Sequence, residues 1–176
     1  MKPSICLIFK VHEPSRLRLY RFFDIGKESH YYDDFANRSA MMKVAANSYL
    51  PMNDLLLKLI RASKGKVKVA FAISGTALEQ MDRYCPEALD SFKELYDTGC
   101  VEFICEPYFH SLAAVENTAE FIHQVKKQQN ALKDFFGAEA TTFVNTDMVY
   151  NDNIGEVISD LGFKAMITEG ARHILG

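Results

Sequence analysis

The segment from Thr141 to Gly170 has the pattern of a β-strand, an α-helix and a second β-strand. Residues 141–144 and 164–168 are short apolar runs typical of buried strands. The residues from about 153 to 161 place four apolar side chains on one helical face: Ile154, Val157, Ile158 and Leu161. Two strands joined in this way pair in parallel through a right-handed crossover. Because a parallel pair needs such helical connections, this unit predicts a sheet covered by helices.

The rest of the chain continues this alternation. Further strands are predicted at residues 4–11, 66–74 and 101–105. Helices are predicted over 34–49, 77–84, from Pro86 to Gly99, and from Asn117 to about Phe136, with another starting at Pro51 that carries Leu55, Leu56, Leu59 and Ile60. We also expect Thr76 to cap the helix over 77–84, with Glu79 completing a capping box. The fold class is therefore α/β with about five parallel strands and no internal linker.

Composition narrows the classes of partner. The chain has 176 residues, enough for one domain, and a formal net charge of -3, which gives no electrostatic case for binding nucleic acid or a membrane. The four cysteines form no CxxC pair, so we expect neither a metal site nor any other cofactor. Cys6 and Cys105 lie in apolar runs and are expected to be small buried side chains. No apolar run approaches a membrane span, and the N-terminal run reads as a strand, so a cytoplasmic location is expected.

Polar side chains follow every predicted strand. In parallel α/β folds, ligands bind where the carboxyl ends of the strands meet. We therefore take the polar residues at these ends as candidate site residues. They are His12, Glu13, Ser74, Gly75, Glu106, Tyr108, His110, Asn145, Asp147, Tyr150 and Glu169.

The segment from Ser15 to Asp33 is rich in arginine, tyrosine and phenylalanine. It is too long for a tight connection between a strand and a helix, and long ordered loops are often functional. Aromatic faces pack on the apolar faces of sugars, so one interpretation is a sugar-binding surface. The other interpretation is a structural loop held together by its own aromatic side chains. The composition of the segment leaves both open.

Four segments of the chain resemble glycoside hydrolase family 57, the family of α-amylases, 4-α-glucanotransferases and branching enzymes. They are VHEPSRLRLYRFFDIG, FAISGTALEQ, VEFICEPYFHSL and FVNTDMVYND followed by LGFKAMITEG. The likeness runs in order over essentially all of the chain, and its bacterial α-amylase-like members are the most similar. It implies an incomplete (β/α)7-type barrel, of which residues 1–176 are the N-terminal portion, truncated after about five strands. It also implies retaining catalysis by two carboxylates about 5–5.5 Å apart.

The resemblance implies that Asp147 is the nucleophile and that the other candidate residues bind an α-glucan. Three departures from the family pattern matter. The family has Glu where this chain has Asp147, and the carboxylate of Asp retreats by about 1 Å, a misplacement that can cost on the order of 100-fold in rate. No residue matches the acid/base Asp of the family, and Glu13 replaces the Gln of the HQP motif. We therefore expect no glycosidase turnover from the 176-residue chain.

Three functions remain open. The first is an α-glucan hydrolase or transferase, and the second is a glucan-binding homologue with a degenerate site. The third is a polysaccharide deacetylase, although the chain lacks the Asp-Asp pair and the His-x-x-x-His spacing expected for its metal. Purely structural roles also remain possible for three residues. Asp147 could cap the turn before the helix at Asn153, His110 could be a packed loop residue, and Glu169 could cap the end of its strand or pair with Arg172.

The open edge of such a sheet favours a covering partner. A parallel barrel stopped after five strands leaves an apolar edge strand without a neighbour. We therefore expect the rest of the barrel, encoded beyond residue 176, or a dimer partner to cover it.

Overall fold

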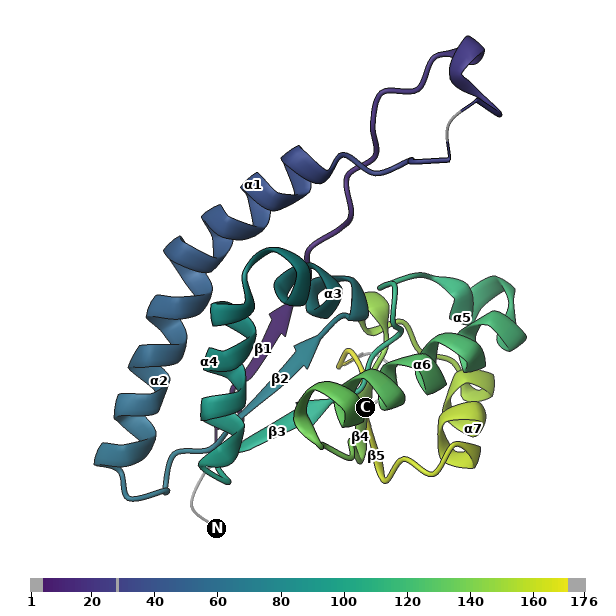
Figure 1. The fold of residues 1–176 in the computed structure, drawn as a ribbon. Helices are drawn as coiled ribbons and strands as arrows, with labels where there is room; N and C mark the ends of the chain where they lie inside the picture. The colour runs from purple at the N-terminus through teal and green to yellow at the C-terminus, as the bar shows by residue number, and fades with distance from the viewer. Residues whose placement is uncertain (1–4, 28, 171–176) are drawn as a thin grey trace.

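The computed structural model describes residues 5–27 and 29–170, in which all the paired strands of the sheet run parallel (Figure 1). The strands are β1 Ile8–Val11, β2 Val69–Ile73, β3 Val101–Ile104, β4 Thr142–Val144 and β5 Ala165–Ile167. Strands β1, β2 and β3 pair in that order, and β4 pairs with β5. A parallel bridge between Cys105 and Phe143 joins the two groups. The predicted α/β class and the five strands are confirmed.

The described strands do not close into a barrel. Within residues 5–27 and 29–170, β1 pairs with β2 alone and β5 pairs with β4 alone, so two edges of the sheet have no strand beside them. The alternation of side chains along β2 separates two faces of the sheet. Phe71 and Ile73 point into the main core beneath the helices, whereas Ala70 and Ala72 join a smaller apolar cluster with Ile104 and Val144. We call the face that carries this smaller cluster the inner face.

Helices cover the other face of the sheet (Figure 1). Their bounds are α1 Asp34–Val44, α2 Leu50–Ala62, α3 Gly75–Tyr84, α4 Pro86–Asp97, α5 Ala113–Glu116, α6 Thr118–Phe136 and α7 Asp152–Asp160. Short helical turns occupy η1 Phe22–Asp24, η2 Ala45–Tyr49 and η3 Thr146–Met148. The predicted start of α6 is confirmed, because the Asn117 side chain accepts a hydrogen bond from the Glu120 N–H at 3.0 Å. Gly137 ends this helix in the left-handed conformation.

The prediction that Pro51 opens a separate helix is wrong. Helix α1 continues through the π-turn η2 into α2 without an interruption, and Pro51 is the second residue of α2. A wide π-turn directly before Pro51 accommodates a residue that has no N–H to donate.

The leucines of α2 divide between its buried and its exposed face. Leu55 and Leu59 are 50% and 46% exposed, whereas Leu57 is buried. The buried Asn53 side chain donates to the Ser91 hydroxyl of α4 at 2.8 Å. This contact between the two helices turns the adjacent face of α2 inward, which three consecutive leucines could not specify.

The cysteines and the helices give two smaller findings. Cys105 is buried as expected, but Cys6 is exposed, because it precedes the start of β1 and lies outside the sheet. All four cysteines are free thiols. Among the described residues, no helix combines the length and the apolar character that crossing a membrane requires.

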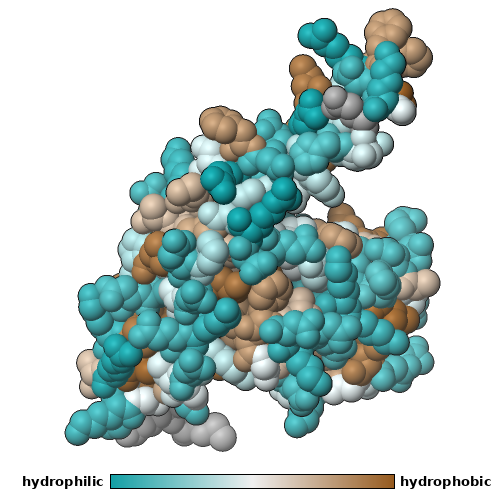
Figure 2. Space-filling view, viewed as in Figure 1, coloured by the Kyte–Doolittle hydropathy of each residue, from teal (hydrophilic) through white to brown (hydrophobic). Residues whose placement is uncertain are grey.

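Residues 15–27 and 29–33 form an arm that projects from the body beyond α1 (Figures 1 and 2). Its two sides pair through an antiparallel bridge between Leu17 and Tyr32. The Tyr20 and Tyr31 rings lie 5.2 Å apart, so aromatic contacts do support the arm from within. Phe22 and Phe23, however, are largely exposed at η1. Contacts within the arm therefore account for only some of its aromatic side chains.

Candidate functional site

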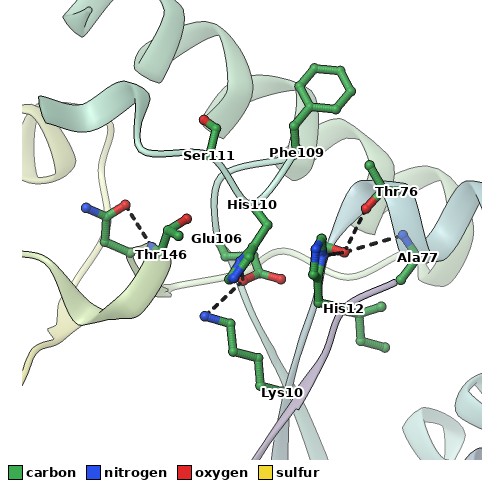
Figure 3. Close-up of polar contacts among 12 residues, drawn as sticks. Lys10, His12, Thr76, Ala77, Glu106, Phe109, His110, Ser111 and Thr146 are labelled. Carbon is green, nitrogen blue, oxygen red and sulfur yellow. Dashed lines mark hydrogen bonds and ion pairs between the residues drawn. The ribbon is translucent and has the colours of Figure 1, made fainter. Parts of the chain in front are cut away.

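The carboxyl ends of β1, β2 and β3 bring four of the predicted residues into one connected group (Figure 3). His12 Nδ1 lies 2.8 Å from Ser74 Oγ. The rings of His12 and His110 lie 4.3 Å apart at an angle of 33°. His110 Nδ1 in turn lies 3.3 Å from Glu106 Oε2. The expectation that strand ends gather these side chains is met here by direct contacts.

Glu106 is the fully buried acid of this group. Its Oε2 lies 3.7 Å from Lys10 Nζ, whereas its Oε1 has no hydrogen-bond partner among the described residues. A buried carboxylate oxygen is costly without a donor, so this atom is suited to receive one from a ligand. Lys10 was not predicted. Its signal in the sequence is a charge inside an apolar strand, two residues before His12.

Ser74, rather than Thr76, caps helix α3. The Ser74 hydroxyl accepts from the Ala77 N–H at 3.3 Å and lies 3.1 Å from Thr76 Oγ1. The predicted cap at Thr76 is wrong because the helix begins at Gly75, so Thr76 already lies within its first turn. Glu79 does not complete a capping box either. It accepts a hydrogen bond from the Tyr108 hydroxyl at 2.5 Å.

Gly75 and Tyr108 are held together by close packing. The Gly75 N–H donates to the Tyr108 carbonyl at 2.9 Å, and a Cβ atom on Gly75 would lie only 2.2 Å from the Tyr108 ring. Burial and the hydrogen bond to Glu79 raise the pKa of the Tyr108 phenol. Both residues are therefore fixed by packing, and Tyr108 is too buried to offer a ring face to a ligand.

Burial of His12 favours its neutral form. Burial first, and then the neighbouring His110, lower the pKa of His12 below its ordinary value of 6.5. Glu106 and Glu13 act in the opposite direction and raise the pKa of His12. Glu13 Oε1 lies 2.7 Å from Arg16 Nη1. The extra charge that Glu13 brings to the HQP-like motif is thus paired with Arg16. At neutral pH the His12 ring can accept or donate one hydrogen bond without carrying a charge.

Asp147 lies in the turn after β4, exposed and in the left-handed conformation with φ 51°. The buried Asn145 side chain supports this turn by donating to the Val149 carbonyl at 2.9 Å. Asp147 lies in the turn before α7, as its alternative role requires, whereas the Asn151 side chain caps the helix itself by accepting from the Ile154 N–H.

Backbone strain is concentrated at the same strand ends. Four residues other than glycine have positive φ in the described part of the chain. They are Lys64, His110, Asp147 and Met148. Three of the four lie in the turns after β3 and β4. Such conformations cost on the order of 1–3 kcal/mol and cluster at functional sites, so their positions agree with a site at this edge.

Asp147 and Glu169 line one cavity of about 440 Å³ together with Lys10. The remaining lining is apolar and comes from the inner face and η3: Ile8, Ala72, Val144, Met148 and Ile167. The two acids predicted at neighbouring strand ends therefore share a cavity. Arg172, the alternative partner of Glu169, lies outside the described residues. Tyr150 turns instead toward α7, where its hydroxyl lies 3.5 Å from Asp152 Oδ1.

The geometry supplies no donor set for a metal-dependent deacetylase. Among residues 5–27 and 29–170, no three His, Cys, Asp or Glu side chains are placed to hold a metal ion together. His12 and His110 face each other ring to ring, an arrangement that differs from two nitrogens converging on one ion.

Comparison with known proteins places the chain among carbohydrate-active proteins. The family described as Glycosyl hydrolase family 57 matches residues 6–176. A protein of Methanocaldococcus jannaschii named "Putative alpha-amylase" is 38% identical over 174 residues, covering 96% of this chain and 36% of that protein. The chain thus spans about a third of the length of this relative.

Two solved structures have a similar fold. The 4-alpha-glucanotransferase of Thermococcus litoralis matches with a TM-score of 0.68 and 16% identity, over 93% of this chain and 22% of that chain. A family 4 carbohydrate esterase of Streptomyces lividans matches with a TM-score of 0.53 and 12% identity, over 93% of this chain and 61% of that chain. At these identities the likeness shows the fold alone.

Proposed function

The chain belongs to glycosyl hydrolase family 57, and from this membership we propose that the protein acts on α-1,4-linked glucans of the starch and glycogen type. The proposed reaction is retaining hydrolysis or 4-α-glucanotransfer. Residues 1–176 would form the N-terminal portion of an incomplete (β/α)7 barrel. The observation that carries the proposal is the shared cavity of Asp147 and Glu169, beside the His12–Glu106 group at the carboxyl ends of the strands.

In this proposal Asp147 is the nucleophile. It stands where the family motif has Glu, and its exposed carboxylate lines the cavity. A retaining enzyme forms a covalent bond between this carboxylate and the anomeric carbon, while a second carboxyl group protonates the leaving oxygen. Lys10 and Glu169 line the same cavity and would bind sugar hydroxyl groups.

The His12–Glu106 group would position the sugar. Its members contact one another closely, so their side chains are held in place before a ligand arrives. The buried Glu106 Oε1 has no hydrogen-bond donor among the described residues, and a sugar hydroxyl would supply one. Neutral His12 adds a hydrogen bond without repelling or attracting a charge.

A specific observation favours a second candidate function. The nucleophile position carries Asp, whose shorter side chain would sit about 1 Å from the position of a Glu carboxylate. A glucan-binding homologue without turnover would keep the same cavity and positioning group. For the 176-residue chain by itself we propose this non-catalytic behaviour.

Substitution at Asp147 tests both candidates. Turnover of starch and maltooligosaccharides is measured in the longest natural form for the parent, Asp147→Glu, Asp147→Ala and, as a control outside the cavity, the exposed Glu156→Ala. An active parent with an inactive Ala variant supports Asp147 as nucleophile. An inactive parent whose Glu variant is active indicates a decayed enzyme. Binding of maltooligosaccharides without turnover in any variant supports the second candidate, and absence of both binding and turnover contradicts the proposal.

A further inference from the structure

A second cavity of about 330 Å³ lies between the arm, helix α3 and the turn after β3. Its lining includes Tyr32, Thr76, Glu79, Gln80, Arg83 and Phe109. It shares no lining residue with the cavity of Asp147. None of its lining residues is among the candidate site residues named from the sequence. Three features indicate what it binds.

A buried side chain with an unpartnered acceptor lies in the wall of this cavity. Gln80 is only 5% exposed and lines the cavity wall. Its Nε2 donates to the Glu13 carbonyl at 2.7 Å, which fixes the orientation of the amide. Its Oε1 has no hydrogen-bond partner among the described residues. Leaving such an atom unsatisfied is costly, so the position is suited to a ligand that carries a donor.

Two exposed aromatic rings border the cavity. Tyr32 is 50% exposed on the arm and Phe109 is 43% exposed in the turn after β3. The Phe109 ring is held in place by Tyr108, edge to face at 4.9 Å, and by Lys127, whose Nζ lies 4.5 Å from the ring centroid. The bridge between Leu17 and Tyr32 holds the backbone at the other aromatic residue. Rigid, exposed rings beside hydrogen-bonding groups are suited to the alternating apolar and hydroxyl-bearing surface of a sugar.

The charges at this cavity are already paired. Glu79 accepts from Tyr108 and lies 3.8 Å from Lys127 Nζ. Arg83 lies 3.2 Å from Asp34. A phosphate or carboxylate ligand would have to compete with these pairs for Arg83. A neutral polyhydroxyl ligand would not, so the balance of charge favours an uncharged sugar.

A chain of hydroxyl contacts connects the cavity to the candidate site. Thr76 lines the cavity and its Oγ1 lies 3.1 Å from Ser74 Oγ, which contacts His12 Nδ1 at 2.8 Å. Figure 3 shows Thr76 on the side of His12 that is opposite Thr146. We propose that the cavity is a remote subsite that binds one glucose unit of an α-glucan whose other units occupy the Asp147 cavity. This inference rests on the proposed function and adds that affinity grows with chain length.

The test compares a short and a long glucan. The 176-residue chain is titrated calorimetrically with maltose and with maltohexaose, as the parent, Tyr32→Ala and Phe109→Ala. The matched control is Phe35→Ala, which removes an exposed ring of α1 that does not line the cavity. We expect the parent to bind maltohexaose more tightly than maltose, and each cavity variant to reduce this ratio about tenfold. The control should keep the parent ratio.

The outcomes separate the two proposals. If the parent binds both glucans equally, or if the cavity variants bind maltohexaose as the parent does, the remote subsite is wrong and the proposed function survives. If the parent binds neither glucan, the proposed function fails and the subsite with it. Circular dichroism of each variant checks that the fold is retained, and both rings are exposed enough for the substitutions to leave the core intact.

Discussion

At the scale of single residues, the closest packing in the candidate site is between Gly75 and Tyr108. A Cβ atom at Gly75 would overlap a buried ring that Glu79 holds in place. We expect Gly75→Ala to lower the free energy of unfolding by about 1–3 kcal/mol, measured by urea denaturation. Gly155→Ala is the matched control, because the added methyl group meets only the exposed Tyr150, which can move. A Gly75→Ala protein as stable as the parent would show that the ring can shift.

His12 predicts a dependence of stability on pH. Its pKa is lowered in the folded protein by burial and by His110, with Lys10 also lowering it and Glu106 and Glu13 opposing. The unfolded chain therefore binds a proton more readily than the folded one at acidic pH. The contribution of neutral His12 to stability is fully present above its unfolded pKa of 6.5. This contribution is lost as the pH falls through 6.5 toward the folded pKa.

The measurement is the free energy of unfolding between pH 7.5 and 5, compared between the parent and His12→Gln. The loss on acidification should be smaller in the variant, which has no imidazole to protonate at this position. The exposed His123→Gln should behave like the parent. Equal losses in the parent and His12→Gln would contradict the assignment.

The membership of the His12 group was predictable, but its contacts were not. Strand ends of a parallel sheet converge whatever their sequence, and this placed His12, Ser74 and Glu106 together. The ring contact between His12 and His110 depends on the left-handed backbone of His110, which no local pattern indicates. Lys10 was missed because a charge inside an apolar strand is normally read as an exposed position.

At the scale of elements, the cap of α7 separates a structural from a functional role for the turn after β4. Asn151→Ala removes the side-chain acceptor for the Ile154 N–H, so we expect a loss of about 1 kcal/mol in thermal or urea unfolding. Asp147→Asn keeps a residue type that tolerates positive φ and should change stability by less than about 0.5 kcal/mol. A larger loss for Asp147→Asn than for Asn151→Ala would support the structural interpretation of Asp147.

Local sequence signals predicted the positions of most helices and strands. The errors occurred where tertiary packing determines the structure. The strands were predictable because their apolar runs are bounded by glycine and polar residues. Helix α6 was predictable because Asn117 and Gly137 mark its ends. Pro51 was misread because a proline normally starts or stops a helix, whereas here the π-turn before it lets the helix continue. The cap of α3 was predicted at Thr76 instead of Ser74 because serine and threonine are both good caps. Only the backbone conformation selects between the two residues.

At the scale of the whole molecule, the inner face of the sheet is the main uncovered surface that we consider. The edges β1 and β5 have no neighbouring strand in the described residues, and the cavity of about 440 Å³ between them is largely apolar. The sequence predicted an open edge because the strand count falls short of a barrel. It could not predict that Asp147 and Glu169 would stand at the rim of this uncovered face.

The uncovered face predicts that the 176-residue chain associates with itself. Leu7 and Ile8 are exposed at the β1 edge, and such an edge attracts either the remaining strands of a longer barrel or a second copy. In sedimentation experiments we expect the mass of the parent to rise with concentration. Ile8→Lys places a charge on this face and should shift the protein toward a monomer. Leu59→Lys adds the same charge to an exposed position of α2 and should sediment like the parent. A parent that stays monomeric at all concentrations would contradict self-association, and a monomer produced by Leu59→Lys alone would move the interface to α2.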